Sequence, residues 1–122
     1  MLENIMFDDA IGMCGYPIDI HSPDGSEMDH TFLKPGSWYS VPYRSLITPQ
    51  IKNLLVAGRC ISTTHEALAS VRLTPIVMAM GQAAGTAVSI AIKSDNNVHS
   101  VDITELRSQL TKDGAFLEPY LK

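Results

Sequence analysis

The feature that most constrains the fold of this 122-residue chain is a run of 20 residues, 73–92, without a charged side chain. Thr74 is a good N-cap and Pro75 suits the first helical position, so the run predicts a helix from Pro75 to about Lys93. Apolar residues occupy nearly every side of this helix, which predicts burial on nearly every side. A chain of this length contains too little protein to surround such a helix, so we expect the helix to need neighbours that the chain does not supply.

The same run has the length of a membrane-spanning helix. Its strongly apolar residues are few, and Gln82 lies near its midpoint, where an unpaired buried amide costs roughly 2–7 kcal/mol. Pro75, Thr86 and Ser89 weaken the case for a membrane span further. We therefore expect a helix buried in protein, and no membrane partner.

Composition narrows the class of protein. Hydrophobic residues make up 45% of the chain and charged residues 18%, which is typical of a globular domain. The net charge of −4 and the scattered basic residues argue against a nucleic-acid partner. Cys14 and Cys60 lie in neither a CxxC motif nor a metal-ligand spacing, and two lone thiols fit a reducing compartment. The first ten residues hold acidic and no basic side chains, unlike a secretory signal, so we expect a cytoplasmic protein.

Residues 1–48 have the pattern of strands and turns. Residues 16–21 alternate apolar and polar, which predicts a half-buried strand. Residues 22–25 (SPDG) and 34–36 (KPG) predict turns. Residues 37–47 are rich in aromatic and β-branched types and predict another strand; Pro42 within it removes a backbone donor, so this strand should lie at an edge or be bulged.

Residues 49–93 and 94–122 differ in sequence pattern from residues 1–48. The apolar run 54–57 ends at Gly58 and predicts a strand buried on both faces. Thr63 with Glu66 three residues later predicts a capping box for a short helix over 65–70. After a polar link at 94–97, Asp102 with Glu105 predicts the start of a second helix. Leu106 and Leu110 supply its apolar stripe, and Gly114 its end.

The junction of Gly58 and Arg59 with the start of the long helix is a candidate ligand site. A glycine at the carboxyl end of a buried strand allows close approach to the backbone, and unpaired amides at a helix start attract anionic or oxygen-rich groups. An ordinary strand–loop–helix connection would show the same spacing, so spacing alone leaves both interpretations open.

Five segments, together with Ser62, resemble one family. They are residues 41–47 (VPYRSLI), 53–59 (NLLVAGR), 65–67 (HEA), 70–72 (SVR) and 78–85 (MAMGQAAG). In combination they resemble the C-terminal region of the FAD-dependent oxidoreductases related to the fumarate reductase flavoprotein class. The resemblance extends from about residue 19 to residue 117.

The resemblance implies a mixed α/β fragment. Residues 1–48 would be the end of a substrate or cap-domain sheet, residues 49–93 the last strand and long helix of an FAD/NAD(P)-binding Rossmann-like domain, and residues 94–122 a polar link with a C-terminal helix. The implied cofactor is FAD. The residues implied to bind it are Gly58, Arg59, Thr74, Ile76 and Val77.

One departure from the family affects the expected activity. The strand–GxGxxG–helix unit that cradles the pyrophosphate is absent, because the glycines of this chain do not have that spacing. We therefore expect the chain alone to hold FAD poorly and to be inactive. The missing N-terminal FAD-binding region is its implied partner.

Arg72, His65 and Arg44, with Tyr43, are the candidates for catalysis or substrate binding. An arginine near a flavin can hold a substrate carboxylate or donate a proton, and histidine titrates near neutral pH. Arg72 and His65 would equally serve as partners of loop carbonyls.

Other polar residues give weaker signals. Asp19 and His21 share a strand face but have no third ligand, so we predict no metal site. Cys60 lies beside Arg59, but a packed structural thiol is the favoured interpretation.

The predicted function is hydride transfer between flavin and a small organic substrate, in the intact enzyme. The alternative is a non-catalytic interaction module that docks a partner chain through its apolar helix. A small residue occurs at every fourth position of this helix, at Gly81, Gly85 and Ser89. These residues form a smooth strip that another backbone can approach closely. On either interpretation we expect self-association, because soluble monomers rarely expose so large an apolar surface.

Overall fold

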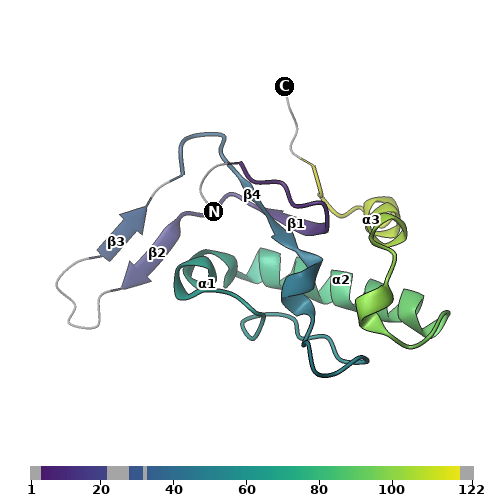
Figure 1. Ribbon diagram of the computed structural model, residues 1–122. Coiled ribbons are helices and arrows are strands. Elements are labelled where there is room, and N and C mark those ends of the chain that lie inside the picture. The colour runs from purple at the N-terminus through teal and green to yellow at the C-terminus, as the bar shows by residue number, and fades with distance from the viewer. Residues whose placement is uncertain (1–3, 22–27, 32, 119–122) are drawn as a thin grey trace.

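The computed structural model describes residues 4–21, 28–31 and 33–118. Two short antiparallel strand pairs and three helices make up the mixed α/β architecture (Figure 1). β1 (Ala10–Cys14) pairs with β4 (Tyr39–Pro42), and β2 (Ile18–His21) pairs with β3 (Met28–Thr31). A 3₁₀ turn, η1 (Tyr43–Leu46), follows β4 directly.

The strand predictions are confirmed in part. β2 falls within the predicted strand 16–21, while the predicted turn at 22–25 lies outside the described residues. The strand predicted over 37–47 is shorter, because the chain after Pro42 turns into η1. Pro42 pairs with Ala10 beside an irregularity of register between Ala10 and Gly12, which confirms that the proline sits at a bulged end.

The buried strand predicted for residues 54–57 is wrong for this chain. Leu55 forms only an isolated bridge with Ile47, and the Val56 amide donates to the Leu46 carbonyl at 2.8 Å. Leu54 is 40% exposed. A strand buried on both faces needs neighbouring strands in its sheet, and the described part of the chain supplies a partner along one edge only.

The helices follow the prediction closely, with corrections at two N-caps. α1 (His65–Val71) is capped by Thr64 rather than Thr63, and the Thr64 hydroxyl accepts from the Ala67 amide at 3.2 Å. α2 (Thr74–Ile92) has Leu73 at its N-cap position, so Thr74 is the first helical residue and not the cap. The residue before a proline avoids helical geometry only by preference, and here the proline takes the second position of the first turn.

The C-terminal part contains a 3₁₀ turn, η2 (Val98–Ser100), and α3 (Ile103–Lys112). Asp102 caps α3 as predicted, because its carboxylate accepts from the amides of Thr104 and Glu105 at 2.7 and 3.1 Å. Gly114, predicted as the stop, has a φ of +85° just beyond the helix.

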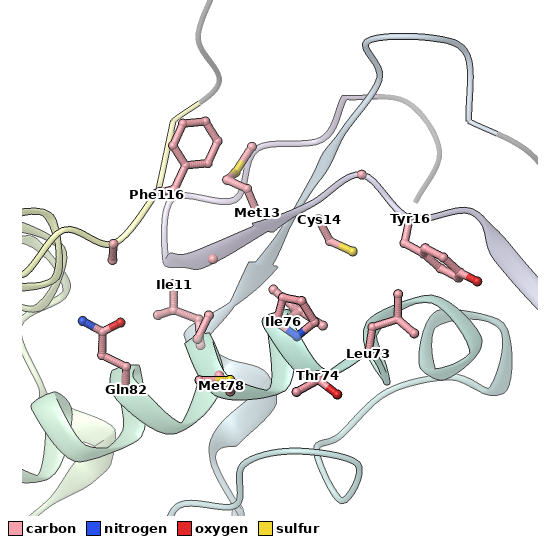
Figure 2. Close-up of a pocket in the computed structure, with 15 residues that line it drawn as sticks. Ile11, Met13, Cys14, Tyr16, Leu73, Thr74, Ile76, Met78, Gln82 and Phe116 are labelled. Carbon is pink, nitrogen blue, oxygen red and sulfur yellow. The ribbon is translucent and has the colours of Figure 1, made fainter.

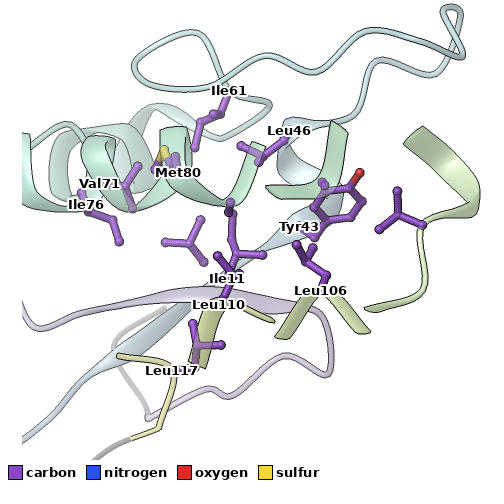
Figure 3. Close-up of a cluster of buried hydrophobic side chains, with 14 of the residues drawn as sticks. Ile11, Tyr43, Leu46, Ile61, Val71, Ile76, Met80, Leu106, Leu110 and Leu117 are labelled. Atoms are coloured by element: carbon purple, nitrogen blue, oxygen red, sulfur yellow. The ribbon is translucent and has the colours of Figure 1, made fainter. Parts of the chain in front are cut away.

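The core lies where β1, β4 and η1 meet the inner faces of α2 and α3 (Figure 3). Ile11, Leu46, Met80, Leu106 and Leu110 are almost fully buried. The core therefore contains side chains from each of the three segments into which the sequence divides.

Burial of α2 differs from the prediction. Only one face is buried, formed by Ile76, Met80, Ala83, Ala87 and Ala91. On the outer face Met78 is 69% exposed and Ile92 65%. A Cβ added at Gly81 or Gly85 would meet nothing within 4 Å. No element within the described residues covers the outer face of α2.

By length and composition α2 also qualifies as a membrane-spanning helix, although only 28% of its most apolar window is buried here. The core helix of a soluble protein passes the same test, so this finding gives weak support to a membrane span.

Candidate functional site

The turn at Gly58 lies against the first turn of α2. Gly58 has a φ of +89°, a conformation that glycine adopts readily and other residues rarely. A Cβ at this position would lie 3.5 Å from Cγ1 of Val77. The Ile61 amide donates to the Gly58 carbonyl at 3.4 Å, which closes the turn. The structure thus brings together two residues, Gly58 and Val77, that are far apart in sequence.

Arg59 links the same turn to the junction between α1 and α2. Its Nε donates to the backbone carbonyl of Arg72 at 3.3 Å, while the rest of the residue is exposed. Arg59 and Arg72 therefore lie side by side, next to the start of α2.

The start of α2 presents unpaired amides. Leu73 has no side chain that can cap the helix, and Pro75 has no N–H. The first backbone bond runs from the Val77 amide to the Leu73 carbonyl at 3.0 Å, so within the described residues the amides of Thr74 and Ile76 have no backbone partner. The Ile76 side chain is buried in the core. Such a helix start attracts negative charge.

A cavity of about 750 Å³ lies between β1 and the start of α2 (Figure 2). Its walls are residues 11–16, residues 73–76 with 78, 79 and 82, and the C-terminal residues 115 and 116. None of these side chains carries a charge; Cys14, Tyr16, Thr74 and Gln82 contribute its few polar atoms. The volume falls within the roughly 300–1,000 Å³ that is typical of small-molecule sites.

The β1 wall of this cavity was not predicted from sequence. Gly12 and Gly15 on either side of Cys14 were the available signal, because glycine within a strand often marks close approach of another element. A Cβ at Gly12 would lie 3.1 Å from Cδ1 of Ile76, so β1 and α2 are in tight contact at this point.

A smaller pocket of about 190 Å³, which contains charged side chains, lies beside α1. Arg72, His65 and Asp19 line it together with Ile20, Leu68 and Ala69. The Arg72 guanidinium lies 3.6 Å from Oδ2 of Asp19 and donates to the Asp19 carbonyl at 3.4 Å. Both are long for N–H···O contacts, which cluster at about 2.7–3.2 Å. Two predicted site residues, Arg72 and His65, are therefore brought together.

A buried hydrogen-bonded chain fixes the elements around both pockets. The hydroxyls of Tyr39 and Ser70 are hydrogen bonded, and Ser70 donates to the Tyr16 carbonyl at 2.6 Å. Because the Ser70 proton goes to this carbonyl, the Tyr39 hydroxyl must donate to Ser70. Burial, followed by the neighbouring Cys14 thiol, raises the pKa of Tyr39 well above its usual value. This chain connects β4, α1 and the segment between β1 and β2.

Arg44 and Tyr43 lie in other surroundings. The Arg44 guanidinium pairs with Asp9 at 2.6 Å and stacks over the Phe7 ring at 4.7 Å. Tyr43 is 2% exposed, and its hydroxyl donates to the Val98 carbonyl at 2.8 Å. Burial raises the pKa of Tyr43 to about 12. Their contacts join segments of the fold and do not reach Arg72 or His65.

Within the part of the chain that the structure describes, no group of three or more potential ligands could hold a metal ion. Both cysteines are free; Cys14 is buried, and the exposed Cys60 thiol donates to the Ala57 carbonyl at 3.2 Å.

Comparison with known proteins identifies the family. The family model described as FAD dependent oxidoreductase matches residues 1–110, which is most of the chain. No curated protein and no solved structure matches this chain. The chain, with its Gly58 turn packed on the start of α2, belongs to the FAD-dependent oxidoreductase family.

Proposed function

We propose that this chain is the C-terminal part of an FAD-dependent oxidoreductase related to the fumarate reductase flavoproteins. Hydride transfer between the flavin and a small organic substrate would be its reaction. The observation that supports this best is the contact between the Gly58 turn and Val77, beside the uncapped amides of Thr74 and Ile76.

The residues present fit one part of FAD. The start of α2 offers two N–H donors and the positive end of a helix dipole, where the electron-rich edge of a flavin would be stabilised. The Gly58 turn, without a side chain, lets the backbone come close to the ribityl and pyrophosphate part, and Arg59 adds an exposed positive charge. Hydride chemistry belongs to the cofactor when it is bound, and these residues would hold and orient it.

Arg72 and His65 form the substrate end of the proposed site. They line the smaller pocket together with Asp19, and the Arg72 backbone carbonyl accepts a hydrogen bond from Arg59. Arg44, the third sequence candidate, is engaged with Asp9 and Phe7, so the proposal gives it a structural role.

The pyrophosphate cradle is the part that this chain does not provide, since its glycines lack the GxGxxG spacing. We propose that the exposed face of α2 packs against the region of the enzyme that carries this cradle. When that region is missing, the same face should support self-association.

Two measurements test the proposal. The purified chain should be colourless, with no flavin turnover, whereas the intact enzyme should carry FAD through gel filtration. In the intact enzyme, Gly58→Val should lower FAD retention, because valine rarely adopts a φ near +89°. Full retention of FAD by that variant would contradict the placement of the cofactor, and stoichiometric yellow FAD on the isolated chain would refute the expected need for a separate cradle.

A further inference from the structure

We propose that Ser70 is a positioning residue for the flavin, because its two hydrogen bonds hold the junction between α1 and α2 where the first amides of α2 can meet the cofactor. This inference rests on the proposed function, because it concerns the same helix start. It follows from a buried hydroxyl that connects three segments of the chain just before α2 begins.

Ser70 lies in the last turn of α1, and its relative exposure is 0%. It donates to the Tyr16 carbonyl at 2.6 Å and accepts from the Tyr39 hydroxyl, so its donor and its acceptor are both used. α1 also buries alanine, at Ala67 and Ala69, so apolar packing alone does not require a hydroxyl here. A buried hydroxyl with all its hydrogen bonds made specifies one arrangement of the elements around it.

The hydrogen bonds of Ser70 act on the α1–α2 junction. Val71 is the last residue of α1, and Arg72, which follows it, keeps helical backbone angles. Leu73 is already the N-cap position of α2, so a short and rigid connection joins Ser70 to the helix start. Tyr16 and Leu73 both line the large cavity, at the same end of the view in Figure 2. A shift of Ser70 relative to Tyr16 would therefore displace the start of α2.

Two other contacts hold α2 without fixing its direction. Gly58 lies against Val77 and Gly12 against Ile76, in both cases through apolar atoms that limit how closely the helix can approach. A hydrogen bond also depends on angle, so Ser70 restricts rotation and sliding that these contacts permit. The direction of the helix axis sets how strongly its positive end acts on a flavin.

Hydrogen exchange of the purified chain, measured by NMR without flavin, tests the role of Ser70 in holding the junction. The amides of Arg72 and Val77 are hydrogen bonded on either side of it, at 3.1 and 3.0 Å. Ser70→Ala should accelerate their exchange at least about five-fold more than exchange in α3. Asp102→Ala is the matched control, because it destabilises the chain through the α3 cap and should accelerate exchange mainly in α3.

The midpoint potential of the flavin in the intact enzyme tests the positioning itself. Ser70→Ala should weaken binding of reduced FAD at least about five-fold more than binding of oxidised FAD, because the helix start stabilises the negative charge of the reduced flavin. The potential should therefore fall. Asp102→Ala should leave it unchanged, since a loss of overall stability does not distinguish the two redox states. Tyr39→Phe removes one of the two hydrogen bonds of Ser70 and should shift exchange and potential in the same direction by a smaller amount.

Equal effects of Ser70→Ala and Asp102→Ala on junction exchange would overturn the inference, and so would an unchanged potential in a Ser70→Ala enzyme that retains FAD. If Ser70→Ala does not fold, Tyr39→Phe takes its place, and wild-type exchange and potential in that variant would overturn the inference. An intact wild-type enzyme that does not hold FAD would refute the proposed function, whereas the exchange measurement does not depend on FAD, so the two failures can be told apart.

Discussion

Replacing the glycines of α2 with alanine should stabilise this chain, although the sequence alone suggests a packed strip at these positions. A Cβ at Gly85 or Gly81 meets nothing within 4 Å, so packing contributes no cost. The remaining effect is helix propensity, which favours alanine over glycine by about 0.8–1.0 kcal/mol in a helix interior. Each substitution should therefore raise the free energy of unfolding by close to that amount.

The size of the thermal shift follows from the length of the chain. An unfolding entropy of about 2.1 cal/mol/K per residue gives about 0.26 kcal/mol/K for a chain of this size. Gly85→Ala should then raise the Tm by about 3–4 °C, measured by circular dichroism at 222 nm. Gly85→Leu should also raise it, because the larger side chain has open space to occupy.

Gly12→Val provides the contrast. Gly12 lies in β1 and faces the packed side of α2. Its Cβ would lie 3.1 Å from Cδ1 of Ile76 and 3.5 Å from Cβ of Ala79, and the added methyl groups would push β1 away from α2. Overpacking of this kind costs roughly 1–3 kcal/mol, so the Tm should fall. If Gly85→Ala or Gly85→Leu lowers the Tm, the outer face of α2 is covered in solution, and the reasoning from open space fails. Repeating the melts at several protein concentrations shows whether a second copy is what covers it.

Three further outcomes follow from buried or capping groups. Ser70→Ala removes the acceptor of the Tyr39 hydroxyl and the donor to the Tyr16 carbonyl, so chemical denaturation should show a loss of about 1–3 kcal/mol; no loss would mean that water replaces the hydroxyl. Burial favours the neutral phenol of Tyr43, whose pKa rises to about 12, so the stability it contributes is complete below pH 10 and is lost as the pH rises towards 12. Ultraviolet titration should show Tyr43 ionising late, and an unchanged profile in Tyr43→Phe would contradict this. Asp102→Ala should cost about 0.5–2 kcal/mol by loss of the α3 cap, with Asp102→Asn retaining most of the stability.

Local signals were the most reliable guide to this fold. Asp102 caps α3 and Gly114 follows it as predicted, because a cap needs only the amides of the next turn. The extent of α2 was also predictable to within one residue at each end, because proline favours the first turn of a helix. Thr64 took the place of Thr63 as the cap of α1, which shows that two adjacent threonines cannot be distinguished by spacing alone.

Predictions that depend on distant neighbours failed or were missed. Residues 54–57 have the composition of a buried strand, but that composition describes the sheet into which they would fit and not a preference of the segment itself. β1 was missed because Ala10–Cys14 contains glycine and methionine and shows no alternation. The candidate site was likewise predicted only in part. The residue types of Arg72 and His65 identified them as candidates, whereas the cavity wall formed by β1 was not predicted.

Under the proposed function, the position of the site on α2 lets this chain orient a cofactor whose pyrophosphate is held elsewhere. Gly58 packs on Val77, and Gly12 on Ile76, so the first turn of the helix is fixed from two sides. Further along, the outer face is open at Gly81 and Gly85. Under the proposed function, most of the binding energy for FAD would come from a pyrophosphate cradle elsewhere, and this chain would set where the flavin edge meets the helix start. Contacts at Gly12 and Gly58 should then govern positioning, and the open face of α2 should govern how the rest of the enzyme attaches.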